Sequence, residues 1–126
     1  MTTKIMLVDD ALIMRMMLRD IIRQLADCTI VAEAGKPELV MPLFREQQPD
    51  IVCLDLTLDD SQVPAGITLL AEIKRANPAV RVAIISALEQ QEITDQALAL
   101  GANAYITKPF NSGEVAATLH RLAVMA

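Results

Sequence analysis

Short apolar runs alternate with longer amphipathic segments along the whole chain. Five of the runs have the length of a β-strand, and they occupy residues 4–8, 29–33, 51–55, 81–86 and 103–107. The central runs are almost continuously apolar, which is typical of strands that are buried on both faces of a parallel sheet. The pattern therefore predicts five parallel strands.

The segments between these runs have helical spacing. We predict helices at residues 12–25, 37–47, 66–76 and 90–100, and a last helix that begins after Asn111. One face of the first helix carries Met14, Met17, Leu18, Ile21, Ile22 and Leu25. Their spacing indicates that this face packs on the sheet, with the methionines as flexible core filler.

Residues that begin or end helices support these boundaries. Pro37 suits the first turn of a helix, where its missing N–H is not needed. Gly101 suits the position just after a helix, which often has a left-handed backbone. Asn111 and Glu114 have the spacing of an N-terminal capping box. The alternation of strands and helices therefore predicts an α/β fold with helices on both faces of the sheet.

The length and composition fit one domain. A domain of 126 residues buries about two-thirds of its unfolded surface, and we expect residues 1–126 to form that domain with no second one. Hydrophobic residues make up 53% of the chain but aromatic residues only 2%. Aliphatic side chains must therefore fill the core.

The charge and the cysteines exclude several classes of function. The net charge is −5 and the pI is about 4.7, which argues against direct binding of nucleic acid. Cys28 and Cys53 lack CxxC spacing, so we interpret them as reduced thiols. Neither a signal peptide nor a membrane-spanning stretch is visible in the sequence, and we expect a cytoplasmic protein with no membrane contact.

Polar residues stand where the apolar runs end. Asp9 and Asp10 follow the first run, Asp55 ends the third and Ser86 ends the fourth, while Lys108 follows the fifth. Open parallel sheets bind their ligands at the carboxyl ends of the strands. These five residues therefore predict a single site.

The three acids of this site would repel one another. Neighbouring carboxylates raise each other's pKa values, and a hard divalent cation removes that repulsion. Mg²⁺ prefers oxygen ligands and takes few carboxylates. The site is thus predicted to bind Mg²⁺, against the alternative of a solvated acidic strand end.

Several short motifs occur in order at these strand ends. They are Val8-Asp9-Asp10 with Arg15 and Leu18, Asp55-Leu56, Ser86-Ala87, and Tyr105 to Phe110. Together they resemble the receiver domain of response regulators, and in size a single-domain regulator of the chemotaxis type. The resemblance covers nearly the whole chain. It implies a flavodoxin-like, doubly wound (βα)5 fold with the strand order 2-1-3-4-5.

The resemblance also implies roles for the site residues. Asp10 and Asp55 would bind Mg²⁺ directly, Asp9 through water, and Thr57 through its backbone carbonyl. Asp55 would be the phosphorylated nucleophile, a known role for carboxylates. Lys108 would neutralise the phosphoryl charge, with the bond between Lys108 and Pro109 in the cis form.

A second group of residues is implied to govern the response. Ser86 would bond to the phosphoryl group and Tyr105 would move inward with it, against the alternative that Tyr105 is an ordinary half-buried strand residue. Thr57 and Leu88 would flank the path of the attacking water and set the lifetime of the phosphorylated state.

One segment departs from the family pattern. The family usually has a short Met-Pro turn after the phosphoacceptor, whereas here the loop is longer and carries Asp59 and Asp60. These acids could strengthen Mg²⁺ binding or contact a partner. They could equally belong to a solvated insertion.

The resemblance implies a phosphoacceptor receiver of a two-component phosphorelay. Its donor would be a histidine kinase or a histidine phosphotransfer protein, and its switched surface would bind a downstream target protein. We expect no enzyme activity beyond phosphotransfer to its own Asp55 and slow self-dephosphorylation. The alternatives are an aspartate-dependent phosphohydrolase and a degenerate receiver used for docking. The first usually has a second acid where this chain has Thr57.

Overall fold

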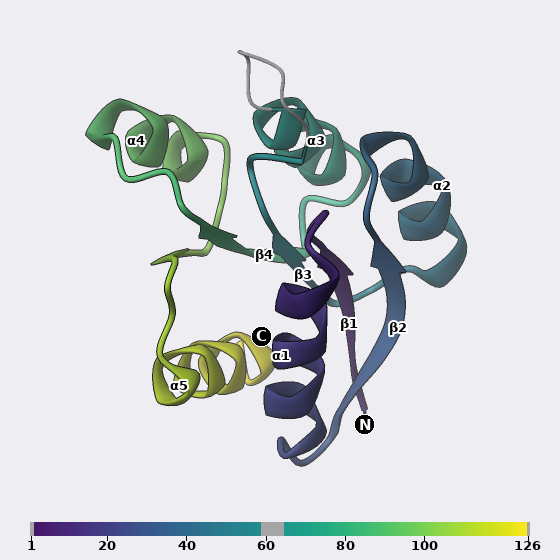
Figure 1. Cartoon of the computed structure of the whole chain (residues 1–126). Coiled ribbons are helices and arrows are strands. Elements are labelled where there is room, and N and C mark those ends of the chain that lie inside the picture. Colours follow the sequence, from purple (N-terminus) through teal and green to yellow (C-terminus); the bar gives the residue numbers. More distant parts are fainter. Residues whose placement is uncertain (1, 59–64, 126) are drawn as a thin grey trace.

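The computed structural model describes residues 2–58 and 65–125. Within them, five strands form one sheet, and the strands are β1 (Thr3–Val8), β2 (Cys28–Ala34), β3 (Ile51–Leu54), β4 (Arg81–Ser86) and β5 (Ala104–Thr107). All neighbouring strands are parallel. The strand order is β2-β1-β3-β4-β5, which confirms the predicted flavodoxin-like α/β fold (Figure 1).

A helix follows each strand of the described chain. The helices are α1 (Leu12–Arg23), α2 (Pro37–Gln47), α3 (Ala65–Ala76), α4 (Gln91–Ala99) and α5 (Ser112–Ala123). The predicted ends agree with these to within two residues, which is the usual uncertainty of helix ends. In Figure 1, α1 and α5 lie on one side of the sheet and the other three helices on the opposite side.

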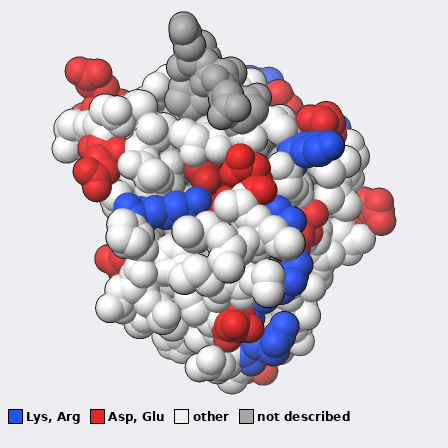
Figure 2. Space-filling view, in the orientation of Figure 1, with Lys and Arg blue, Asp and Glu red and all other residues white. Residues whose placement is uncertain are grey.

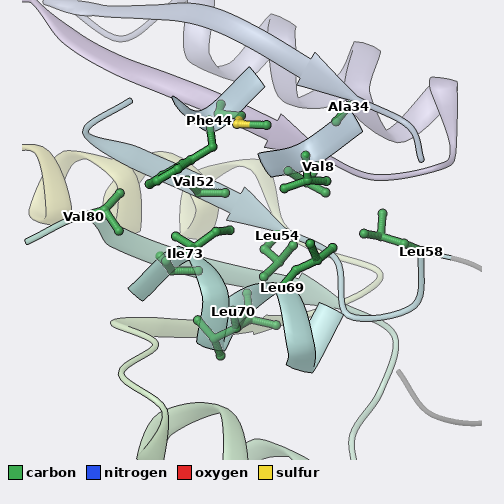
Figure 3. Close-up of a cluster of buried hydrophobic side chains, with 14 of the residues drawn as sticks. Val8, Ala34, Phe44, Val52, Leu54, Leu58, Leu69, Leu70, Ile73 and Val80 are labelled. Carbon is green, nitrogen blue, oxygen red and sulfur yellow. The ribbon is translucent and has the colours of Figure 1, made fainter. Parts of the chain in front are cut away.

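Each face of the sheet has its own hydrophobic core. On one face, Leu18 and Ile22 of α1 meet Val115 and Leu119 of α5 over the strands. On the other, side chains of α2, α3 and α4 pack over alternate strand residues, and Figure 3 labels several of them, including Phe44. Because successive strand residues point to opposite faces, central strands buried on both faces need apolar residues at nearly every position.

Local signals in the sequence place the helix ends. The side chain of Asn111 accepts a hydrogen bond from the backbone N–H of Glu114 at 3.2 Å, so Asn111 caps α5. Gly101 follows α4 with a φ of 106°, a conformation that glycine adopts at little cost. Pro37 is the first residue of α2. These three expectations are confirmed.

The expectation for the α1 methionines is partly wrong. Leu18 and Ile22 are buried as predicted, but Met17 is 43% exposed and its neighbour Met16 is 46% exposed. The apolar arc of α1 is wider than the surface that the sheet and α5 cover. Met16 and Met17 are therefore surface residues and not core filler.

The register of the sheet brings the polar residues that follow the strands to the same end of the sheet. Val8 lies beside Leu54, and Leu54 beside Ile84. Ser86 lies beside Thr107. The residues that follow these positions therefore meet at the carboxyl ends of the strands, where open parallel sheets bind their ligands.

The structure also tests the expectations for membrane spans and for the two cysteines. Among the described helices, none combines the length and the apolar character that a bilayer crossing requires. Cys28 and Cys53 are both free thiols, as expected. Burial raises the pKa of Cys53 to about 12, which leaves this thiol unreactive.

Candidate functional site

Three carboxylates meet at the carboxyl edge of the sheet. Asp9, Asp10 and Asp55 each offer an oxygen, and these oxygens all lie within 4.8 Å of one another. Asp9 is 2% exposed and Asp55 is 3% exposed, whereas Asp10 is open to solvent. In Figure 2, acidic groups gather near the middle of the face, with basic groups to either side.

The backbone holds two of these acids in place. The N–H of Asp55 donates to the carbonyl of Val8 at 2.9 Å, and the N–H of Asp9 donates to the carbonyl of Ala34 at 3.1 Å. The strand pairing thus continues one residue beyond each strand. As a result, both carboxylates start from a rigid part of the sheet.

Lys108 joins these two acids. Its Nζ lies 2.7 Å from Oδ2 of Asp9 and 2.8 Å from Oδ2 of Asp55, and its side chain is 13% exposed. The backbone N–H of Lys108 donates to the carbonyl of Ser86 at 2.8 Å, and the bond to Pro109 is cis. The fifth strand therefore delivers an ammonium group into the acidic site.

The other oxygen of Asp55 is bound by Thr57. Both the backbone N–H and the hydroxyl of Thr57 donate to Oδ1 of Asp55, each at 2.9 Å. In the same way, the N–H of Ala11 donates to Oδ1 of Asp9 at 2.9 Å. These bonds orient the carboxylates. A metal-binding role for the Thr57 carbonyl remains a prediction.

Burial and charge oppose each other at this site. Burial raises the pKa of Asp9 despite the hydrogen bond from Lys108. Burial by itself would lower the pKa of Lys108, but the hydrogen bonds and charges of Asp55 and Asp9 outweigh it, and that pKa is raised. One ammonium group thus faces three acids. Two buried carboxylates and the exposed carboxylate of Asp10 form an oxygen-rich set that fits a hard divalent cation such as Mg²⁺.

Ser86 and Tyr105 are connected through one residue. Ser86 is fully buried, and its Oγ accepts a hydrogen bond from the backbone N–H of Leu88 at 3.3 Å. The hydroxyl of Tyr105 donates to the backbone carbonyl of Leu88 at 2.6 Å. Burial raises the pKa of Tyr105. The two predicted switch residues therefore share the backbone of Leu88.

The structure adds residues that the sequence did not single out for the site. Arg15 donates to the backbone carbonyl of Asp9 at 2.6 Å, and Glu33 of β2 binds Arg15 in turn. A Cβ on Gly66 would lie 2.3 Å from the Cα of Leu56, so α3 closely approaches the backbone that follows β3 and Asp55. In the sequence, the only signal for a role of Arg15 in the site was its place among the motifs shared with the receiver family.

One expectation lies outside the described residues. Asp59 and Asp60 belong to the segment 59–64, which the structure does not describe. Their suggested part in Mg²⁺ binding or partner contact remains a prediction.

Comparisons with known proteins agree with this geometry. A family model described as the response regulator receiver domain matches residues 5–120. The chemotaxis protein CheY of Thermotoga maritima is 33% identical over 123 residues, which cover 98% of this chain and 99% of that protein. CheY of Bacillus subtilis is 35% identical over 121 residues, covering 96% and 98%.

A solved structure gives the same result at the level of the fold. The complex of CheX and CheY with BeF3 and magnesium from Borrelia burgdorferi contains a chain that is 26% identical to this one. The TM-score is 0.87, and the match covers 98% of this chain and 90% of that chain.

Proposed function

The chain belongs to the response regulator receiver family, and from this premise we propose that it is a phosphoacceptor switch that is phosphorylated on Asp55. The observation that carries the assignment is the position of Lys108, whose Nζ contacts both Asp9 and Asp55. Receivers of the CheY type are switches and not enzymes, and they bind Mg²⁺ at an acidic site. The residues around Asp55 support the same role here.

The proposed reaction is phosphotransfer to a carboxylate. An oxygen of Asp55 forms a bond to phosphorus while the bond between phosphorus and the donor's leaving atom breaks, and the leaving group keeps the electron pair. The transition state carries its charge on the phosphoryl oxygens. Lys108, which lies 2.8 Å from Asp55, is placed to neutralise that charge.

The acids would hold the metal that this chemistry uses. Asp9, Asp10, Asp55 and the carbonyl of Thr57 are the proposed ligand set, and Mg²⁺ bound there would neutralise further charge on the phosphoryl group. Thr57 also binds Oδ1 of Asp55 through its N–H and hydroxyl. These two hydrogen bonds orient the Asp55 carboxylate without a contribution from the metal.

The response would pass through Ser86 and Tyr105. The Ser86 hydroxyl is a proposed donor to a phosphoryl oxygen on Asp55, and turning toward it would change the bond that Ser86 Oγ accepts from Leu88. Tyr105 binds the carbonyl of the same residue. A shift of Leu88 would therefore reach Tyr105 and the surface around β5.

The lifetime of the phosphorylated state is proposed to depend on Thr57 and Leu88. They stand two residues after Asp55 and two residues after Ser86. Leu88 is apolar and cannot orient an attacking water by hydrogen bonding, so self-dephosphorylation should be slow.

The proposed donor is a histidine kinase or a histidine phosphotransfer protein, and the proposed receiver of the signal is a downstream target protein. One similar protein, the CheY of Borrelia burgdorferi, has been solved in complex with CheX. The net charge of −5 supports a protein target over nucleic acid.

Two other functions fit less well. An aspartate-dependent phosphohydrolase usually has an acid at the position of Thr57, whose side chain here binds Asp55. A receiver used only for docking would not need acids, hydroxyl and lysine together. Turnover of small phosphate esters would distinguish a phosphohydrolase from a receiver. A phosphohydrolase would hydrolyse them repeatedly, whereas a receiver modifies only itself.

The direct test is intact mass spectrometry after incubation with acetyl phosphate and Mg²⁺. The wild-type protein should gain the mass of one phosphoryl group, and Asp55→Asn should gain none. Asp20→Asn is the control, since Asp20 is a surface residue of α1 with a side chain that is 72% exposed. Equal labelling of Asp55→Asn and the wild type would refute the assignment.

A further inference from the structure

An arginine holds the metal-binding loop from outside the site. The Nη1 of Arg15, in the first turn of α1, lies 2.6 Å from the backbone carbonyl oxygen of Asp9. That carbonyl belongs to the peptide bond between Asp9 and Asp10, and the N–H of Ala11, one residue further on, donates to Oδ1 of Asp9. The guanidinium therefore binds the loop between the two acidic residues.

A carboxylate on the neighbouring strand holds this arginine in turn. The Nε of Arg15 lies 3.2 Å from Oε1 of Glu33. Arg19, one helical turn later, binds both oxygens of Glu33, with Nε 2.5 Å from Oε2 and Nη2 2.8 Å from Oε1. Hydrogen bonds between ionised partners are stronger and better directed than neutral ones.

The network is partly shielded and has little freedom. The side chains of Arg15 and Glu33 are 17% and 22% exposed. Glu33 lies beside Leu7 in the parallel pairing of β2 and β1, so its backbone belongs to the sheet. A Cβ on Gly35 would lie 2.9 Å from Nη1 of Arg15, which shows that the guanidinium occupies space left by a missing side chain.

We propose that Arg15 is a positioning residue for the metal site, with Glu33 and Arg19 as its anchor. The inference rests on the proposed function, because it concerns the loop that carries Asp9 and Asp10. Arg15 reaches the loop through a backbone carbonyl and not through a carboxylate. It therefore sets the direction of the loop without neutralising the acids that the metal needs. Partners of this kind commonly change metal affinity by about 10- to 100-fold.

The sign of the effect separates positioning from simple electrostatics. Arg15 is a cation near three acids, so through-space repulsion makes it oppose the binding of Mg²⁺. Removing it should then strengthen Mg²⁺ binding if charge alone mattered. If Arg15 positions the loop, removing it should weaken binding. The two explanations thus predict opposite changes for the same substitution.

The experiment is a calorimetric titration of Mg²⁺ into the metal-free protein. Arg15→Met should bind Mg²⁺ about 10-fold more weakly than the wild type, and Arg15→Lys should recover part of the loss. At saturating Mg²⁺, the rate of phosphorylation by acetyl phosphate should return toward the wild-type rate. The matched control is Arg23→Met, which removes the same charge from the same helix. Arg23 does not touch the loop, because its side chain is 74% exposed and pairs with Asp20.

A second measurement needs no metal. Hydrogen exchange of the Ala11 amide in the metal-free protein should be faster in Arg15→Met than in the wild type, because this N–H bonds to Asp9 inside the loop. Exchange at β1 should be unchanged. This pattern is not expected if Arg15 only stabilises the fold, since all protected amides would then exchange faster.

Three results would overturn the inference. They are stronger or equal Mg²⁺ binding by Arg15→Met, unchanged exchange at Ala11, and equal weakening by Arg23→Met. Failure of the proposed function would look different, because the wild-type protein itself would then bind no Mg²⁺ and gain no phosphoryl group.

Discussion

The hydroxyl of Tyr105 donates a hydrogen bond to the backbone carbonyl of Leu88, with 2.6 Å between the two oxygen atoms. The N–H of the same Leu88 donates to Ser86 Oγ at 3.3 Å. A strand tyrosine and a residue of the site are thus attached to the backbone of one residue. Movement of Ser86 toward a phosphoryl group would therefore be transmitted to Tyr105 through these two hydrogen bonds.

We predict that Ser86→Ala still accepts a phosphoryl group but transmits it poorly. Without the hydroxyl, neither the phosphoryl group nor the Leu88 N–H has a partner at this position. NMR spectra with and without beryllium fluoride should differ around Tyr105 in the wild type and much less in the variant. The control is Thr29→Ala, which removes an exposed hydroxyl from β2. This strand is the outermost one on the side of the sheet away from β5 and Tyr105. Equal shifts in Ser86→Ala and the wild type would refute the coupling.

Asp9→Asn should stabilise the metal-free protein. Burial raises the pKa of Asp9, so the folded protein disfavours the charged carboxylate, and the neutral amide should increase the free energy of unfolding. Because the pKa in the folded protein lies above that in the unfolded chain, the wild-type penalty is complete above the folded-state pKa and disappears only as the pH falls to the unfolded value. The gain in urea unfolding should therefore be seen at about pH 7 and shrink as the pH falls toward the ordinary value of 3.8. A gain that grows on acidification would contradict this explanation.

Mg²⁺ binding should depend more on Asp10 than on Asp9. The family pattern implies direct contact by Asp10, which is also the exposed member of the cluster, and contact through water by Asp9. Titration of Mg²⁺ into Asp10→Asn should show the larger loss of affinity, and into Asp9→Asn the smaller. Equal losses would count against the assignment of the two acids.

Leu88→Glu should change the lifetime of the phosphorylated protein. Leu88 lies two residues after Ser86 and is only partly buried, so a glutamate there could hold or exclude the attacking water. The decay of the phosphoprotein is measured by mass spectrometry after the acetyl phosphate is removed. Thr57→Ala tests the other side of the same path. Unchanged decay in both variants would remove these residues from the role.

Gly66→Ala should destabilise the fold although alanine favours helices. In an exposed helix the change would stabilise by about 1 kcal/mol. Here the new Cβ would lie 2.3 Å from the Cα of Leu56 and 2.8 Å from the carbonyl oxygen of Asp55. Both are backbone atoms that cannot move freely, so we expect a loss of about 3 kcal/mol. Chemical unfolding measures the change, with the exposed Thr68→Ala on the same helix as control, and any gain in stability would refute the steric argument.

The sequence by itself determined the elements and the grouping of the strand-end acids with Lys108. Near-continuous apolar runs are typical of central strands in a sheet covered on both sides, and the last residues of parallel strands share one edge. For this reason the apolar pattern alone was sufficient to group Asp9, Asp55 and Lys108. The strand order did not follow from the apolar pattern and came from the motifs of the family.

Only the tertiary structure decided which atoms meet. The contacts between Lys108 and Asp9, between Arg15 and Glu33, and between Tyr105 and Leu88 join positions that carry no local signal for one another. The exposure of Met16 and Met17 was likewise decided by the tertiary structure, because it depends on how much of α1 the sheet and α5 cover. Periodicity reports the face of an element that is apolar, because it depends on residues a few positions apart. The packing of distant elements determines how much of that face is covered and which polar groups come within hydrogen-bond distance.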